Sequence, residues 1–256
     1  MAVTWLNTGN ASQEGLKKAE AEQKKRQEAR SGMWRFWLKP GESARITFVD
    51  GFLTKAGLLD FVSYREHHLF LNGEWGNHFV CLEGTPEGPC PICATGDNAS
   101  FVGAFTILDH RKIPSAKEAG KFYTDSPRLY VATMRTVKLL QTMAAKRGGL
   151  AGCTFEVMRT SDKDVRVGNH FDFEEKHSIE ELKAKYMRPV LDKDGKPTAQ
   201  QKTIFVPANY EKEIPFKNRA EVLSIVGGQG TPVGAEPDPA AQESTPASAE
   251  AYAAHL

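Results

Sequence analysis

The stretch from residue 67 to residue 93 reads HHLFLNGEWGNHFVCLEGTPEGPCPIC and holds three of the chain's four cysteines. In a Cys-x-x-Cys pair such as Cys90 and Cys93, two thiolates converge on one ion, and zinc completes its tetrahedron with two further side chains. Cys81 and one histidine of the pair His67/His68 are the expected partners, because neighbouring residues of a strand point to opposite faces and only one can bind. Three thiolates and one imidazole leave no open position for a reactive water, so the stretch predicts one structural Zn²⁺ ion.

Other interpretations of this stretch fit less well. His78 lies only three residues before Cys81 on the same expected strand, which makes it a weaker ligand. Reduced cysteines in an ordinary core would not explain why two prolines bracket Cys90 in a Gly-rich loop with little else to bury. The run PCPIC at 89–93 matches half of the zinc deaminase signature, but no His-x-Glu precedes it, and Cys81 would fill the position that the water needs. With no acid pair or nucleophile–base pair elsewhere, we expect no enzymatic activity.

The composition is that of an ordinary globular protein. The 256 residues are 40% hydrophobic and 25% charged, close to the averages of soluble domains. No window approaches the roughly 18 uninterrupted apolar residues that span a bilayer, and no basic stretch followed by an apolar segment opens the chain. Clustered cysteines fit a reducing compartment, and the isolated Cys153 is an expected buried small hydrophobe. These features predict a cytoplasmic protein without membrane contact.

Composition also divides the chain into three parts. Residues 1–31 form an expected helical arm, because 11–31 is rich in helix-favouring residues but has almost no apolar face. Residues 32–226 form the expected core, with a zinc subdomain at about 60–100. Residues 227–256 have too few apolar side chains to form an ordered structure, and we expect them to be a disordered acidic tail. Since the whole chain carries a net charge of +1 and its last 26 residues carry −4, the preceding 230 residues carry +5.

Short runs rich in β-branched and aromatic residues, separated by turn residues, predict strands at 44–49, 58–71, 101–110, 128–136, 153–159 and 165–173. Five or six such strands favour a small barrel in a mainly β (α+β) fold. Helical spacing and end signals predict flanking helices at 137–147, 179–186 and 218–226. Residues 187–203 predict a charged hairpin or loop.

The spacing of the metal ligands resembles that of a known family. His68-x12-Cys81-x8-Cys90-x2-Cys93 is similar to the His-x12-Cys-x9-Cys-x2-Cys zinc site of phage single-stranded DNA-binding proteins of the helix-destabilising type, with one spacer a residue shorter. The runs RFWLKPGESARITF at 35–48 and CPICATGD at 90–97 are also similar, so the resemblance covers roughly residues 32–175. It implies an OB-fold-like barrel of five to six strands with an inserted zinc-binding subdomain. It also implies sequence-nonspecific binding of single-stranded DNA during phage DNA replication, recombination and repair, in the host cell cytoplasm.

Partners are implied by the same resemblance. Members of the family have a basic N-terminal arm for self-association on DNA and an acidic C-terminal tail that recruits replication or recombination proteins. The arm of this chain carries basic residues interleaved with acids, namely Lys17, Lys18, Lys24, Lys25 and Arg26. The tail carries four acids.

Binding of single strands requires aromatic faces on which bases stack and cations that contact phosphates. The candidate stacking residues are Trp34, Trp37, Tyr64, Phe105, Tyr123 and Tyr130. The candidate phosphate contacts are Arg35, Lys39, Arg45, Arg65, Arg111, Lys112, Lys121, Arg128 and Arg135. Cations and rings alternate most closely at 111–112, 121–123 and 128–130, which predicts a binding face there. The alternative is a zinc-stabilised protein-interaction or transcription-associated scaffold without enzymatic activity, with these rings in its core.

Overall fold

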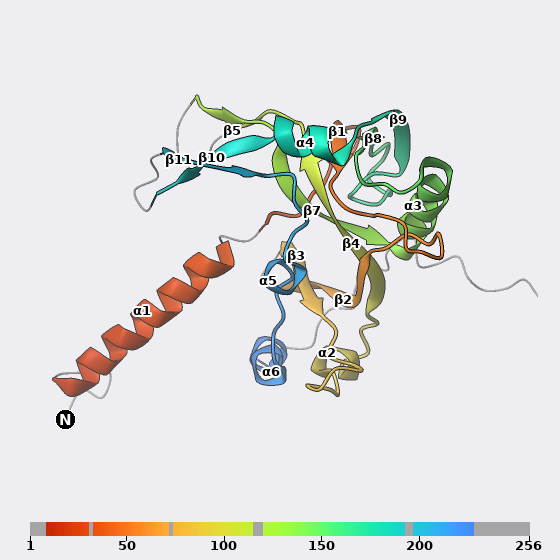
Figure 1. The fold of residues 1–256 in the computed structure, drawn as a ribbon. Helices are drawn as coiled ribbons and strands as arrows, with labels where there is room; N and C mark the ends of the chain where they lie inside the picture. Colours follow the sequence, from red (N-terminus) through yellow and green to blue (C-terminus); the bar gives the residue numbers. More distant parts are fainter. Residues whose placement is uncertain (1–8, 31–32, 72–73, 115–119, 193–196, 228–256) are drawn as a thin grey trace, which may run out of the picture.

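The computed structural model describes residues 9–30, 33–71, 74–114, 120–192 and 197–227 (Figure 1). Its centre is an antiparallel sheet in which neighbouring strands follow the order β3-β2-β4-β1-β8-β9, with β7 paired to β4 as a seventh strand. These strands are β1 Ser43–Phe48, β2 Val62–Leu71, β3 Glu74–Val80, β4 Ser100–Asp109, β7 Ser126–Thr133, β8 Cys153–Met158 and β9 His170–Lys176. Two further antiparallel pairs within the described residues are β5 Ile113–Pro114 with β6 Phe122–Tyr123, and β10 Met187–Leu191 with β11 Pro197–Thr203.

The other strands are arranged around β4. β2 pairs with the first half of β4, from Ser100 to Ala104, and β1 pairs with its second half, from Ile107 to Asp109. β7 pairs with β4 from Val102 to Asp109, so it overlaps both neighbours and must lie along the other edge. β1 and β2 therefore follow one another along one edge of β4, and β4 is covered on both edges.

The sheet does not close into the barrel expected from the strand count. Among the described residues, β3 and β9 end the strand path and β7 pairs with β4 alone. An extended segment, residues 34–38, lies beside β7 in place of a strand. The amide of Phe36 donates to the carbonyl of Leu129 at 2.8 Å, and the amide of Leu38 donates to the carbonyl of Arg166 at 2.8 Å. These isolated hydrogen bonds connect β7 to the loop before β9 without forming a ladder, so the architecture is α+β with an open antiparallel sheet.

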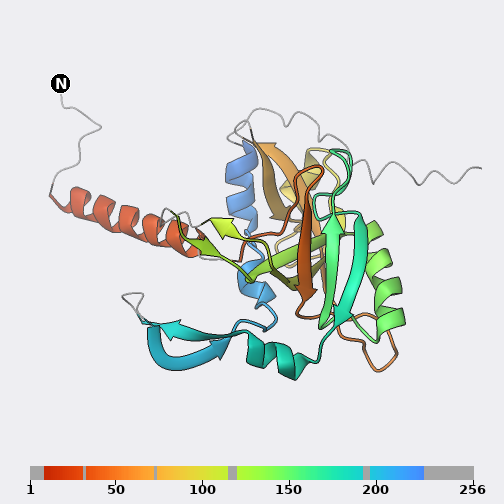
Figure 2. The same cartoon turned by 90° about the horizontal axis from the view of Figure 1, so that it is seen from above.

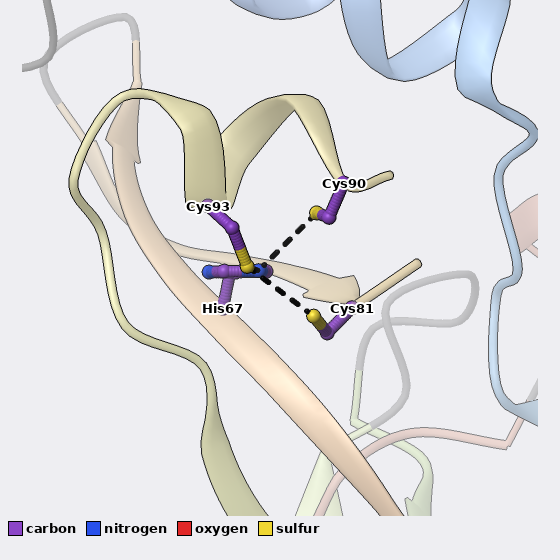
Figure 3. A group of neighbouring side chains, drawn as sticks. All are labelled: His67, Cys81, Cys90 and Cys93. Atoms are coloured by element: carbon purple, nitrogen blue, oxygen red, sulfur yellow. Dashed lines mark hydrogen bonds between the residues drawn. The ribbon is translucent and has the colours of Figure 1, made fainter. Parts of the chain in front are cut away.

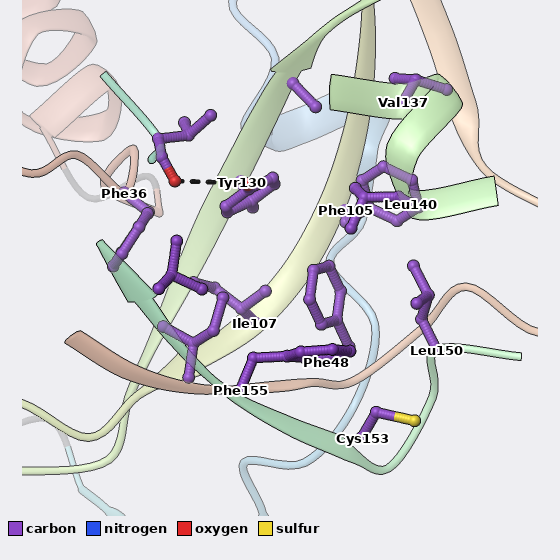
Figure 4. Packing of buried hydrophobic residues seen from close by; sticks show 14 of the residues in the cluster. Phe36, Phe48, Phe105, Ile107, Tyr130, Val137, Leu140, Leu150, Cys153 and Phe155 are labelled. Atoms are coloured by element: carbon purple, nitrogen blue, oxygen red, sulfur yellow. Dashed lines mark hydrogen bonds between the residues drawn. The ribbon is translucent and has the colours of Figure 1, made fainter. Parts of the chain in front are cut away.

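Aromatic side chains form the centre of the main core (Figure 4). The ring of Phe48 packs edge to face against Phe105 and Phe155, each with ring centres 5.8 Å apart, and against Tyr130 at 5.6 Å. All four side chains are fully buried. They come from β1, β4, β7 and β8, so a single cluster ties together strands that are distant in sequence. The amphipathic helix α3 (Met134–Arg147) buries its apolar face against the same cluster.

The chain after β11 crosses the molecule as a strap, which we define as residues 204–227. Phe205 at its start is fully buried and stacks on Tyr186, with ring centres 6.3 Å apart, just after α4 (Ile179–Lys185). The strap contains α5 (Tyr210–Glu213) and ends in α6 (Arg219–Gly227). Figure 1 shows α6, in blue, close to the short helix α2 (Pro91–Ala94). The strap thus runs from the main sheet to the region of the cysteines.

The N-terminal helix α1 (Asn10–Arg30) extends away from the rest of the molecule in both views (Figures 1 and 2). Its residues 10–20 are exposed. Residues 11–31 had few apolar side chains to bury, and the helix accordingly lies apart from the core. Within the described part of the chain, no helix combines the length and apolar character needed to cross a membrane.

Most expected elements are confirmed with shifts at their ends. The strands expected at 44–49, 58–71, 101–110 and 153–159 are β1, β2, β4 and β8, and the helices expected at 137–147, 179–186 and 218–226 are α3, α4 and α6. The hairpin expected at 187–203 is formed by β10 and β11.

Three strands differ from the expectation. β9 begins at His170 and not at residue 165, because the chain turns at Gly168 with a φ of +91°. β7 ends at Thr133, where α3 begins, so the strand expected to continue to residue 136 is too long. A strand that carries His78 and Cys81 was expected without bounds; β3 carries His78 and ends directly before Cys81. The expected tail lies outside the described residues, except for Gly227 at the end of α6.

Candidate metal centre

Two strands and one short helix bring four candidate ligands together. His67 lies on the buried face of β2. Cys81 follows β3 directly, and its amide donates to the carbonyl of Arg65 on β2 at 2.8 Å. Cys90 immediately precedes α2, and Cys93 lies within it. Proline at the first position of α2 favours this local turn, because its fixed φ suits a helix start and it has no amide to leave unpaired.

The ligand atoms of these residues converge (Figure 3). Nε2 of His67 lies 3.5 Å from Sγ of Cys90 and 3.5 Å from Sγ of Cys93, and Sγ of Cys81 lies 3.6 Å from Sγ of Cys93. All four atoms lie within 4.8 Å of one another. Nitrogen and sulfur ligands around a tetrahedral ion, with bonds of about 2.0 Å and 2.3 Å, are expected about 3.5–3.8 Å apart. The group could therefore hold one metal ion with four protein ligands.

Asp97 orients the imidazole of His67. Its carboxylate contacts Nδ1 of His67, which leaves Nε2 facing the cysteines. The side chains are 11% and 0% exposed, so the contact is shielded from water. A carboxylate on the far nitrogen fixes the tautomer and increases the basicity of a metal-binding imidazole. Sequence reasoning did not identify this residue, and its only signal was its position four residues after Cys93.

The histidine in the group is His67, and not His68, from which the spacing of the resemblance was counted. The ring of His68 instead stacks on that of His78, with centres 4.5 Å apart and planes 5° apart. Burial and then the charge of His78 lower the pKa of His68 to about 4. Neither ring of this stacked pair belongs to the ligand group. The alternation of β2 explains the difference, because only one of two successive residues can face the cysteines.

The three sulfur atoms cannot all be charged without a cation. Burial, followed by hydrogen bonding and charge from the sulfurs of Cys81 and Cys90, raises the pKa of Cys93 to about 12. A thiol with this pKa is protonated near pH 7, whereas a thiol that binds a metal ion is deprotonated outright. Cys153 does not belong to the group. It is buried in the main core, where its thiol lies 3.5 Å from the carbonyl of Gly149.

Two of the six candidate stacking residues, Phe105 and Tyr130, lie in the main core. They face each other in the β4–β7 register, and both are fully buried. The hydroxyl of Tyr130 donates to the carbonyl of Val167 at 3.3 Å. A buried ring cannot offer its face to a base, so the stacking prediction is wrong for these two residues. Tyr64 is half-buried, and its hydroxyl donates to Glu66 at 3.0 Å.

Three of the candidate phosphate contacts already bind carboxylates. The ion pairs are Arg35 with Glu66, Arg45 with Glu174 and Glu175, and Arg111 with Asp109 and Glu42. The charge of these arginines is therefore largely neutralised within the fold. Arg111 has a clear structural role, because its guanidinium also donates to the carbonyl of Trp37 at 3.2 Å and so attaches residues 34–38 to β4.

Five exposed side chains lie on two segments that Arg111 joins through the backbone of Trp37, and we call them together the aromatic face: Trp34, Trp37, Lys112, Phe122 and Tyr123. The four rings are 70%, 51%, 48% and 46% exposed, in that order. The tryptophans lie on the segment beside β7, and the contact of Arg111 with Trp37 connects them to the neighbouring Lys112. The ammonium group of Lys112 lies 4.4 Å from the centre of the Phe122 ring. Phe122 was missing from the candidate list, although it lies between the chosen Lys121 and Tyr123.

Arg128 on β7 differs from the paired arginines. Among the described residues, it has neither a hydrogen bond nor an ion pair to a carboxylate. Burial, only partly offset by Asp109 and reinforced by Arg111, lowers its pKa. A partly buried cation without a bound anion is favourably placed to accept one. Arg128 is therefore the candidate phosphate contact that the structure supports best.

The remaining candidates are scattered. Lys39 and Lys121 are exposed. Arg65 donates to the carbonyl of Ala99 at 3.2 Å. Arg135 lies in the first turn of α3, where it lines a surface hollow with Lys163 and others.

Comparison of the chain with family models, with curated proteins and with solved structures finds no match. Its function must therefore be inferred from the side chains described above.

Proposed function

We propose that the protein binds single-stranded DNA without sequence preference and protects it during phage DNA replication, recombination and repair. The observation that supports this most is the aromatic face, where four rings are about half exposed or more and one of them, Phe122, lies beside Lys112. Exposed rings offer faces on which bases can stack, and each stacked base contributes about 1–3 kcal/mol. Stacking is also tolerant of sequence, because every base has a π-face.

The charge around these rings suits a phosphate backbone. Lys112 lies over Phe122, so a base stacked nearby would bring its phosphate within reach of the ammonium group. Arg128 offers a guanidinium that no described carboxylate neutralises. The net charge of +5 over the first 230 residues adds a general attraction for polyanions.

We further propose that the ion is zinc, that its role is structural, and that the fold is OB-like. Three cysteines and one histidine are a donor set that zinc favours, and four protein ligands leave no position for a catalytic water. The protein is accordingly proposed not to be an enzyme. The OB-like interpretation is supported by residues 34–38, which connect β7 to the loop before β9 across the open side of the sheet.

Self-association and recruitment remain proposals drawn from the resemblance. α1 supports the first, since it extends away from the core with Lys17 and Lys18 exposed, where a second copy on the same strand could contact it. Recruitment of replication or recombination proteins is assigned to the acidic tail, in the host cytoplasm.

Fluorescence anisotropy of a labelled oligo-dT, compared with a duplex of equal length, tests the proposal. We expect the single strand to be preferred, with affinity falling steeply between about 50 mM and 200 mM salt as counterions are released. No binding at low salt would contradict the proposal and would favour a protein-interaction scaffold.

Variants locate the binding face in the same assay. Trp37→Ala should weaken binding about 5- to 150-fold through loss of one stack. Phe52→Ala is the matched control, because Phe52 is similarly exposed at 48% but lies beyond the opposite end of β1.

Lys112→Ala should reduce the slope of log affinity against log salt concentration by about one, with Lys55→Ala as its control. Equal losses in the controls would show that the aromatic face is not the site.

A further inference from the structure

The apolar cluster beside the metal ligands is completed by a helix from the end of the described chain. Val222 of α6 is 1% exposed, and Ile225 and Val226 pack at the edge of the same cluster. The rest of the cluster comes from the β2–β3 pair, α2 and the segments that flank α2, namely Leu69, Leu71, Phe79, Cys81, Leu82, Cys90, Ile92 and Ala99. Two metal ligands and α6 therefore share one small core.

Polar contacts attach α6 to the loop that separates two of the ligands. The amide of Arg219 donates to the carboxylate of Glu87 at 3.1 Å, and its guanidinium donates to the carbonyl of Pro89 at 3.1 Å. Both acceptors lie between Cys81 and Cys90. The position of this loop thus decides whether Arg219, at the start of α6, finds these two partners.

α6 cannot hold its structure alone. It has nine residues, and isolated helices shorter than about 12–15 residues are marginal in water. Part of its apolar surface stays in solvent even in the folded protein, since Leu223 is 48% exposed. Its helical state therefore depends on docking against the cluster.

The loop between Cys81 and Cys90 depends in turn on these two candidate metal ligands. Residues 83–89, EGTPEGP, contain no large apolar side chain. Inside the loop the contacts are short local hydrogen bonds, such as Thr85 Oγ1 to the carbonyl of Leu82 at 2.7 Å, and the candidate ligands Cys81 and Cys90 lie at its two ends. A structural ion contributes its binding free energy directly to folding of such a segment. Loss of the ion would release both ends of the loop.

The other end of the strap is anchored without any metal ligand. The hydroxyl of Tyr210 contacts Asp50 and lies 2.9 Å from Oγ1 of Thr106, and the amide of Ala208 donates to the same Oγ1 at 2.9 Å. Phe205 is buried beside β4 and α4. These contacts attach the strap to the main sheet and to α4, and none of them involves the loop between the cysteines.

We propose that the bound ion controls the docking of α6, so that loss of metal releases the chain from about residue 214 onward while residues 204–210 stay attached. This inference rests on the metal part of the proposed function and adds a regulatory role to the site. In the metal-bound state, α6 holds the described chain up to Gly227 against the cluster that contains the cysteines. In the metal-free state, residues 214–227 are no longer held there.

Hydrogen–deuterium exchange of the full chain, with zinc and after chelation under reducing conditions, tests the proposal. Amides of 219–227 should exchange about tenfold faster or more after chelation, whereas those of 204–212 should keep their protection. Unchanged protection of α6 after verified metal loss would overturn the proposal, and so would equal loss in both segments. Native mass spectrometry distinguishes the two proposals: a chain that takes up no zinc refutes the metal centre itself, whereas zinc-bound protein with an unresponsive α6 refutes only the coupling.

Coupling between two sites is reciprocal, so undocking α6 must also weaken metal binding. Val222→Asp should reduce zinc affinity about tenfold or more in competition with a chromophoric chelator, while Leu223→Asp, on the exposed side of the same helix, should change it less than about twofold. If Val222→Asp frees α6 by hydrogen exchange and zinc affinity is unchanged, the coupling does not exist.

Discussion

The main core and the metal region are stabilised in different ways. The main core contains Phe48, Phe105, Tyr130 and Phe155 at its centre, all fully buried and in mutual aromatic contact. The metal region contains smaller aliphatic side chains, a Gly- and Pro-rich loop and four ligands. A large aromatic cluster can stabilise its strands by burial alone, whereas a small cluster of this kind needs a crosslink. The two regions should therefore respond to different perturbations.

The largest effect on folding is expected in the main core. Phe48→Ala should lower the free energy of unfolding by about 3–5 kcal/mol, because it removes a buried ring and leaves a cavity. Metal content at low temperature should be unchanged, since Phe48 contacts no ligand. Chemical denaturation with metal analysis checks both points, and Phe52→Ala provides an exposed aromatic control. Loss of metal in the folded Phe48→Ala variant would show that the two regions are one unit.

A smaller effect, confined to the metal region, is expected for Asp97→Asn. The amide cannot supply the negative charge that orients and polarises His67, so metal affinity should fall about 10- to 100-fold. Resistance of the main core to denaturant should remain close to that of the unmodified protein. Chelator competition measures the affinity. An unchanged affinity would mean that Asp97 is a neighbour of the site without influence on it.

The smallest effect concerns Asp50, which anchors the metal-independent end of the strap. Burial, which outweighs the hydrogen bonds from Tyr210 and Thr106, raises its pKa to about 6. Between about pH 4 and pH 6, the folded protein retains a proton that the unfolded chain has lost, so stability falls as pH rises through this window, by on the order of 1–3 kcal/mol. Asp50→Asn should lack this decrease. Denaturation of both proteins from pH 4 to pH 8 is the measurement, and parallel curves would contradict the assignment.

The sequence was sufficient to predict the three cysteines of the candidate metal group because their chemistry and spacing are local. Three cysteines near three histidines limit the choice to a few sets, whatever the fold. The choice between His67 and His68 was not local, since it depends on which face of β2 lies against Cys90 and Cys93 at α2. The same limit explains the errors at Phe105 and Tyr130.

β4 shows why the sequence pattern did not separate buried rings from exposed ones. Its residues from Val102 to Asp109 are buried on both faces. One face packs on the main core, and the other is covered by the strap, where Tyr210 contacts Thr106 and Phe205 packs with Leu108. The strap lies about 100 residues away in sequence, so no local pattern indicates it. Trp34 and Trp37 are exposed although Phe36 and Leu38 of the same segment are buried, so their stacking role stays a prediction.

Native mass spectrometry of the full chain, of Cys90→Ala and of Cys153→Ala tests the metal centre most directly. Both cysteines are buried, but Cys90 is a ligand and Cys153 belongs to the main core. One zinc ion per chain is predicted for the unmodified protein and for Cys153→Ala, and none for Cys90→Ala. Metal-free unmodified protein that does not take up added zinc, or equal zinc content in all three proteins, would contradict the assignment of these four residues.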